Sequence, residues 1–132
     1  MAQDPGGQRQ SVESGCHRGV EYHPDPMGSE IVIAIYRPRR GREAELDALV
    51  ARHRPALVAA ELVTDRPFVI ARSSDGAVLE IFEWKDRDAA RRAHEDPQVG
   101  EIWSAMGEIA DFPPLADLAE STRHFPHFRP FA

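Results

Sequence analysis

Trp84 and His94 are the pair of side chains in this sequence best placed to do chemistry. Trp84 ends a strand-like run, and His94 follows on a helical segment whose same face carries Ala90 and Ala93. Because these neighbours are small, the imidazole can face a cavity, where a histidine can act as a base. The alternative is structural, with a tryptophan packed in the core and a hydrogen-bonded histidine at the edge of the sheet.

His53 is a second imidazole that can reach the same cavity. It lies on the apolar stripe of a predicted helix, one turn after Leu49 and Val50. A buried histidine with a backbone partner is the commoner arrangement, whereas two imidazoles in one pocket would form a proton-transfer pair or a metal site. No close histidine and carboxylate motif accompanies them, so we expect no metal.

Glu80 and Glu83 cannot work together as an acid and a base. The two side chains point to opposite faces of their strand, because side chains alternate along it. Glu80 shares its face with Phe82 and Trp84, so it is the one that we expect to be buried. A buried carboxylate needs a partner or takes a raised pKa, and Arg72 of the neighbouring strand is the expected cross-strand partner.

A strand, a helix and a hairpin must position these residues. Ile31–Arg37 is rich in β-branched residues, which predicts a strand. A helix is expected over residues 42–60, with a bend at Pro55 because proline lacks the amide donor. Residues 67–72 and 77–84 are β-rich runs joined through an Asp-Gly pair, which favours a hairpin.

A second helical region and a last strand complete the pattern. Asp86 or Asp88 caps a short helix, and Asp96 restarts it as the N-cap before a proline. The helix is expected to break at Phe112, and residues 124–129 form a last strand that their prolines confine to a sheet edge. The order is β-α-β-β-α-β, which predicts an α+β, ferredoxin-like fold with an antiparallel four-stranded sheet.

Both faces of the first strand are apolar. One face carries Ile31, Ile33 and Ile35, and the other carries Val32, Ala34 and Tyr36. Two helices can cover only one face of such a sheet. We therefore expect a homodimer that forms through the other face. The alternative, in which residues 110–123 fold under the sheet, is disfavoured by their two prolines.

Composition limits the classes of function. The 132-residue chain has a formal net charge of −6, and Lys85 is the only lysine among its 16 basic residues. The arginines are scattered, so we expect no nucleic-acid partner. The acidic excess and the lack of an apolar run of roughly 18 residues argue against a membrane partner. Cys16 is the single cysteine and is interpreted as a spectator thiol.

The first 28 residues contain no Ile, Leu or Phe. They are expected to form a disordered tail, or an over-extended start with Met27 as the true initiator. One folded domain is expected over residues 29–132. No secretory signal is recognised, so a cytoplasmic location is expected by default.

One stretch of the chain resembles a known family. It consists of Glu80-Ile-Phe-Glu-Trp84, followed by Asp86, Ala89-Ala90, Ala93-His94, Pro97, Val99 and Trp103. This stretch resembles the antibiotic-biosynthesis-monooxygenase-like domain of the dimeric α/β-barrel superfamily, and the order of elements matches from about Glu30 to Phe128. The resemblance implies a cofactor-free oxygenase that takes polycyclic phenols or quinols in a cleft between the helices and the sheet. Relatives degrade haem.

The resemblance also implies roles for individual residues. Trp84 would shape the pocket, and His94 would bind haem iron or act as a base toward a phenol. Catalytic members commonly place an asparagine on or near the first strand, but this chain contains no asparagine. Tyr36 occupies that region and can donate a hydrogen bond instead.

The leading hypothesis is a cofactor-independent oxygenase that acts on an aromatic substrate. The catalytic candidates are His53 and His94, and the substrate-binding candidates are Tyr36, Glu80, Trp84 and Trp103. A non-catalytic dimeric module that binds a small ligand in the same cleft is the second hypothesis. Haem binding through His94 is the third.

Overall fold

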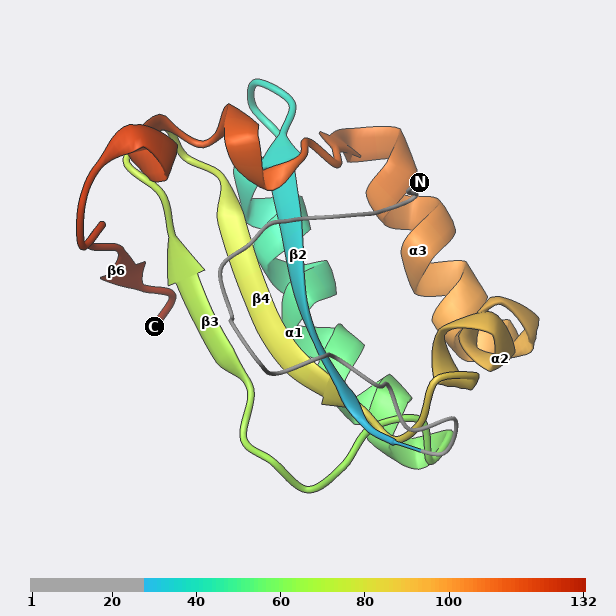
Figure 1. Cartoon of the computed structure of the whole chain (residues 1–132). Coiled ribbons are helices and arrows are strands. Elements are labelled where there is room, and N and C mark those ends of the chain that lie inside the picture. The colour runs from blue at the N-terminus through green and yellow to red at the C-terminus, as the bar shows by residue number, and fades with distance from the viewer. Residues whose placement is uncertain (1–27) are drawn as a thin grey trace, which may run out of the picture.

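The computed structural model describes residues 28–132 (Figure 1). The tail expected over residues 1–28 lies outside the described residues except for Gly28, and so do Cys16 and Met27. The elements are the strands β2 (Glu30–Pro38), β3 (Val69–Arg72), β4 (Val78–Trp84), β5 (Ala110–Asp111) and β6 (Arg129–Pro130), the α-helices α1 (Glu43–Ala59), α2 (Ala89–Glu95) and α3 (Pro97–Ile109), and the 3-10 helices η2 (Leu115–Asp117) and η3 (Ala119–Thr122).

The strands form one sheet in the order β5-β2-β4-β3-β6, with every neighbouring pair antiparallel. The first four strands in this order have the ferredoxin-like arrangement, and α1 and α3 lie together on one face (Figure 1). The α+β, ferredoxin-like fold predicted from the sequence is therefore confirmed. None of the helices in residues 28–132 is long and apolar enough to cross a membrane.

The last strand of the ferredoxin-like unit was predicted in the wrong place. It is β5, whose two residues pair with Arg37 and Pro38, and not residues 124–129. Pro113 and Pro114 follow at once and have no amide hydrogen to donate, so the strand cannot extend. The C-terminal segment instead adds the fifth strand, β6, at the opposite edge beside β3.

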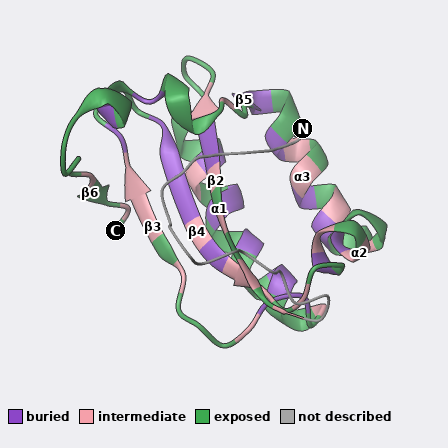
Figure 2. Ribbon diagram, in the orientation of Figure 1, coloured by how far each residue is buried: buried purple, intermediate pink, exposed green. Residues whose placement is uncertain are grey.

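Local sequence accounts for the helices. The apolar stripe of α1, including His53, is buried, and the helix runs through Pro55 without interruption. The N-cap of α3 is Asp96, whose carboxylate accepts a hydrogen bond from the Val99 amide at 2.9 Å, as predicted. Figure 2 shows the buried residues concentrated where α1 and α3 face the sheet.

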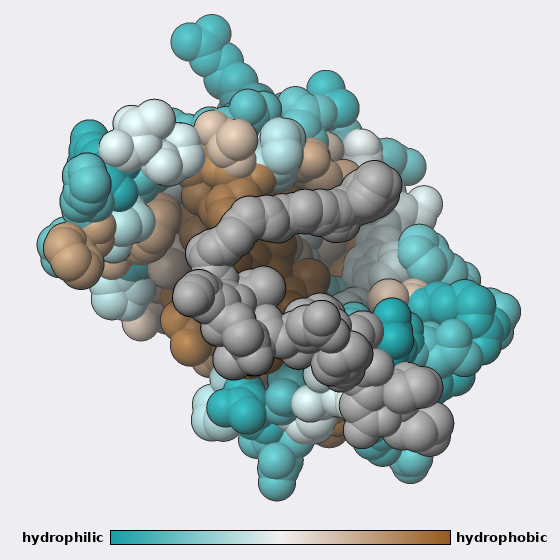
Figure 3. Space-filling view, viewed as in Figure 1, coloured by the Kyte–Doolittle hydropathy of each residue, from teal (hydrophilic) through white to brown (hydrophobic). Residues whose placement is uncertain are grey.

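The outer face of the sheet, opposite the helices, is only partly covered. Leu118 and Phe128 of the C-terminal segment pack against Ile35 and Leu79 there. The interpretation that this segment stays off the sheet was therefore wrong, because the chain returns to the sheet after its two prolines. Figure 3 shows hydrophobic surface gathered in the middle of this face.

Candidate active site

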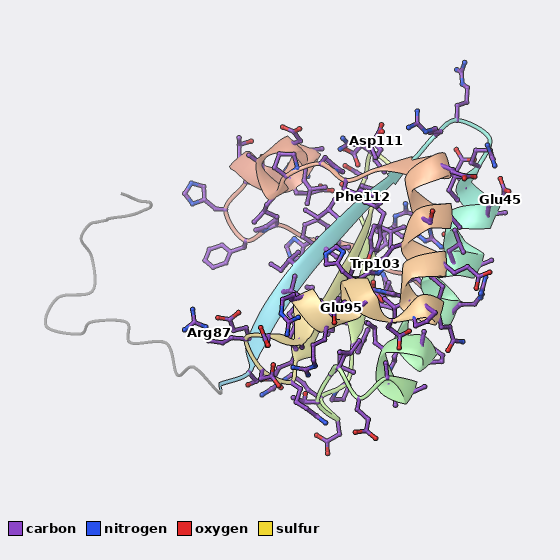
Figure 4. The ribbon with its side chains drawn as sticks, turned by 90° about the vertical axis from the view of Figure 1, so that its right-hand side faces the viewer. Glu45, Arg87, Glu95, Trp103, Asp111 and Phe112 are labelled. Carbon is purple, nitrogen blue, oxygen red and sulfur yellow. The ribbon has the colours of Figure 1, made fainter. Side chains whose placement is uncertain are left out.

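A cavity of about 730 Å³ lies between β2, β4 and α3. Its lining is mostly apolar, and no Asp, Glu, Lys or Arg among residues 28–132 contributes to it. Five of the six residues proposed from the sequence line it, namely Tyr36, His53, Trp84, His94 and Trp103. Figure 4 views this side of the molecule and labels Trp103 on α3 and Phe112 just beyond the end of that helix.

His53 lies on α1 at the inner wall of the cavity and is 1% exposed. Both of its ring nitrogens have partners. Nδ1 lies 2.8 Å from Oε1 of Glu80, and Nε2 accepts the indole N–H of Trp103 at 2.8 Å. The imidazole is therefore held between a buried carboxylate and a side chain that lines the cavity.

These contacts fix the tautomer of His53. An indole nitrogen can only donate, so Nε2 carries the lone pair and the ring proton is on Nδ1, where it is donated to Glu80. A carboxylate that accepts a hydrogen bond from Nδ1 of a histidine orients the ring, and it stabilises the imidazolium that forms when Nε2 gains a proton.

Glu80 is completely buried in the centre of β4. Its Oε1 also accepts the hydroxyl of Tyr36 at 2.6 Å, while its Oε2 has no hydrogen-bond partner among the described residues. Burial, and then the charge of Glu80, raise the pKa of Tyr36 far above its usual value, so the phenol remains a donor. Glu80 does not line the cavity and contacts it only through its two partners.

The expected pairing of Glu80 with Arg72 is wrong. Arg72 binds Asp47 of α1, with one nitrogen 2.8 Å from the carboxylate, and its guanidinium lies 4.5 Å from the centre of the Phe131 ring. Arg72 pairs with Val78, two residues before Glu80 on β4. From that position its long side chain lies at the end of the sheet where α1 provides Asp47.

Trp84 and His94 both line the cavity, and the structure gives neither of them a hydrogen bond to Glu80 or His53. Trp84 packs edge-on against Phe82, with ring centres 5.0 Å apart. His94 is exposed and meets Trp103 edge-on at 4.8 Å. The structure therefore brings the two imidazoles to one cavity, with Trp103 between them.

The chain of hydrogen bonds from Tyr36 through Glu80 and His53 to Trp103 was missed at the sequence level. Its members come from β2, β4, α1 and α3, so no local spacing connects them. One available signal was the helix-facing position of both Tyr36 and Glu80, since a buried carboxylate needs donors nearby. Within residues 28–132, no three His, Cys, Asp or Glu side chains are grouped as a metal site.

Comparisons with known proteins support the fold. No family model and no curated protein matches the chain. Among solved structures, a conserved protein from Methanosarcina mazei Go1 superposes with a TM-score of 0.54 at 15% identity, covering 67% of this chain and 91% of that one. SnoaB, a cofactor-independent oxygenase from Streptomyces nogalater, gives 0.52 at 22% identity, with 65% and 88% covered.

A candidate antibiotic biosynthesis monooxygenase from Bordetella bronchiseptica gives a TM-score of 0.52 at 22% identity, with 65% of this chain and 93% of that one covered. At such low identities these likenesses establish the fold and carry no residue roles. The chain has the fold of antibiotic-biosynthesis-monooxygenase-like domains, as its sequence predicted.

Proposed function

We propose that this chain is a cofactor-independent oxygenase that acts on a phenol- or quinol-type aromatic molecule in the cavity between helices and sheet. The observation that carries the proposal is the buried Glu80–His53 pair, which presents an imidazole to an apolar cavity of about 730 Å³. The shared fold with SnoaB, itself a cofactor-independent oxygenase, supports the same class of reaction.

The reaction needs a base, an apolar environment and oxygen. His53 takes a proton from the substrate, and Glu80 stabilises the imidazolium that forms. The deprotonated ring then supplies electrons to O₂. When an activated ring CH₂ becomes C=O, one oxygen atom is kept and the other leaves as water, so atoms and electrons balance without a further reductant. An apolar cavity that excludes water favours the reactive anion over side reactions.

The remaining residues have supporting roles in this proposal. Trp84 and Trp103 provide aromatic surface for a planar ring. His94, exposed at the rim of the cavity, is placed to exchange protons with solvent. Tyr36 and Glu80 position His53 from behind, and Glu80 lies outside the lining of the cavity.

The proposal includes a homodimer through the outer face of the sheet. Val69, Ile81 and Ile33 lie side by side across three strands on that face, and Val69 is 58% and Ile33 45% exposed. Apolar surface of this kind marks an interface in soluble proteins. Ile33 also lines the cavity, so a partner on this face would lie next to the site.

Oxygen uptake tests the proposed reaction. The protein is mixed with a panel of anthrones and quinols, and O₂ consumption is followed with an electrode. We expect one O₂ consumed per substrate, and we expect His53→Gln to lower kcat by about a hundredfold because the general base is lost. Binding of panel members without any oxygen uptake would reject the oxygenase.

A non-catalytic binding module is the alternative that one observation favours. Both nitrogens of His53 are already bonded within the protein, so His53 offers no free lone pair to the cavity while Trp103 holds its position. In that case aromatic ligands bind by calorimetry, and neither oxygen uptake nor substrate conversion follows.

Haem binding through His94 fits the cavity less well. His94 is an available imidazole, but none of the lysines and arginines that the structure describes lines the cavity to pair with the two haem propionates. Titration with hemin tests this function directly. A Soret shift that His94→Ala abolishes would support it, and an unchanged spectrum would reject it.

A further inference from the structure

The hydrogen bond between Trp103 and His53 blocks the atom that the proposed reaction needs. His53 Nε2 is the only ring nitrogen on the cavity side of the pair, and the indole N–H of Trp103 occupies its lone pair at 2.8 Å. A base cannot accept a substrate proton through a lone pair that is already in use. The bond must therefore open before the site can work.

We infer that Trp103 occupies the position of the substrate hydroxyl and is displaced by it, so that the site selects aromatic molecules carrying a protonated O–H. This inference rests on the proposed role of His53 and adds to it a specificity-determining residue, Trp103, whose displacement requires a ligand that donates a hydrogen bond. The proton passes from the ligand hydroxyl to Nε2, which leaves a phenolate and an imidazolium paired with Glu80.

The donor requirement follows from the fixed tautomer. Because the His53 proton is on Nδ1 and is donated to Glu80, Nε2 can only accept. A carbonyl, ether, carboxylate or phosphate oxygen has no hydrogen to offer and cannot replace the indole. Within the described part of the chain, the cavity also lacks Lys and Arg side chains that would bind an anion. A neutral hydroxyl on an apolar ring meets both conditions.

Of the two partners, Trp103 is the one free to move. His53 is 1% exposed and is held on its other side by Glu80, which also binds Tyr36. Trp103 is only half-buried, and its indole N–H makes this one hydrogen bond among the described residues. Opening the site therefore breaks one bond and leaves the buried pair intact.

There is open space on the helix beside Trp103. Gly100, one turn earlier on α3, lines the same cavity, and a Cβ at that position would meet no atom within 4 Å. His94 packs edge-on against the indole at 4.8 Å. The side of α3 at Gly100 is therefore the one toward which we expect the indole to turn.

The chain contains two tryptophans, which allows a direct test by ¹⁵N NMR. The Trp84→Phe variant leaves Trp103 as the only indole and assigns its Nε1–H signal in the full-length protein. The probes are 1-naphthol and 1-methoxynaphthalene, which share a ring but differ in the donor. We expect 1-naphthol to move the Trp103 Nε1–H signal upfield to saturation, and 1-methoxynaphthalene to leave the hydrogen bond in place.

Affinity supplies a second measurement. Trp103→Phe removes the competing donor and keeps an aromatic ring. The preference for 1-naphthol over 1-methoxynaphthalene should then rise about fivefold, the equivalent of one ordinary hydrogen bond. The inference is wrong if 1-naphthol fails to bind, if it binds with the Trp103 signal unmoved, or if both probes displace the indole equally.

Oxygen uptake separates this inference from the proposed function. Displacement of Trp103 by 1-naphthol, together with no oxygen uptake for any substrate, would leave the inference standing and reject the oxygenase. Oxygen uptake while the hydrogen bond between Trp103 and His53 stays intact would support the oxygenase and reject the inference.

Discussion

At the scale of single residues, the proposed chemistry depends on one buried carboxylate. Glu80 accepts hydrogen bonds from Tyr36 and His53 at the same oxygen, and all three side chains are buried. Removing Glu80 would lower the stability of the fold by more than the net contribution of its two hydrogen bonds. The reason is that both donors would stay buried, away from water, with no acceptor in its place. The sequence analysis singled out all three residues but not their connection, since they belong to three different elements.

Substitutions of Glu80 should separate stability from catalysis. Glu80→Ala leaves two buried donors unpaired and should lower the free energy of unfolding by about 2–5 kcal/mol. Glu80→Gln keeps an acceptor for both donors, so it should lose less than half as much stability, as measured by urea unfolding.

The same Glu80→Gln variant should reduce kcat at least about tenfold, because a neutral amide cannot stabilise the imidazolium. Tyr36→Phe is the matched control, since it removes one donor to Glu80 and leaves the carboxylate charged. Equal kcat values for wild type and Glu80→Gln would contradict the role given to Glu80.

At the scale of elements, the C-terminal segment is fastened by a second buried carboxylate. Glu120 of η3 is 2% exposed and accepts the Ser73 hydroxyl and the Ser74 amide at 2.8 Å, both in the turn between β3 and β4. The hydroxyl of Ser73 and then the amide of Ser74 lower the pKa of Glu120 to about 2. Leu118, two residues earlier, is thereby held against the outer face of the sheet.

This fastening predicts a dependence of stability on pH. The pKa of Glu120 falls from an ordinary value of 4.5 to about 2 in the folded chain, so its contribution is complete above pH 4.5 and is lost as the pH falls toward 2. We expect the difference in free energy of unfolding between wild type and Glu120→Gln to shrink over that interval.

The pKa of Glu83 is also lowered to about 2, first of all by its hydrogen bond with Arg66. Because Glu83 is present in both wild type and Glu120→Gln, its titration cancels in the difference between their free energies of unfolding. Glu101→Gln serves as a control, because Glu101 is exposed on α3 and its carboxylate makes no hydrogen bond among residues 28–132. A difference between wild type and Glu120→Gln that is constant from neutral pH down to pH 2 would show that Glu120 does not fasten the segment.

At the scale of the whole molecule, the two faces of the sheet are covered to different extents. The helices cover most of the inner face, while η2, η3 and Phe128 cover only part of the outer one (Figures 1 and 2). The apolar residues on both faces of β2 were enough to predict a sheet that is apolar on both sides, and the Asp-Gly and Asp-Pro pairs were enough to place the hairpin and the start of α3.

The route of the chain after α3 could not be predicted in the same way. Its strands, β5 and β6, are two residues each, and their burial depends on single side chains such as Leu118. Periodicity needs a longer run than that to be informative. The hydrogen-bonded chain behind the cavity was equally out of reach, because its distances depend on how α1 packs on the sheet.

Two valines of similar exposure test the proposed dimer. Val69 lies on the outer face and is 58% exposed, whereas Val58 on α1 is 51% exposed. Placing a charge in an apolar interface costs several kcal/mol, so Val69→Glu should convert a dimer into a monomer in sedimentation equilibrium. Val58→Glu should leave the dimer intact. If both variants sediment with the same molecular mass, the outer face of the sheet is not the dimer interface.

Glu80 also determines which alignment of the sheet can form. Neighbours of Glu80 on β4 are apolar on both faces, with Val78 and Phe82 on one side and Leu79 and Ile81 on the other. A slip of β4 by one residue would exchange these faces at little hydrophobic cost. The slip would also carry the carboxylate away from His53 and Tyr36 and leave both donors buried without an acceptor. We therefore expect Glu80, the carboxylate that orients the His53 imidazole, also to ensure during folding that the strands pair in a single register.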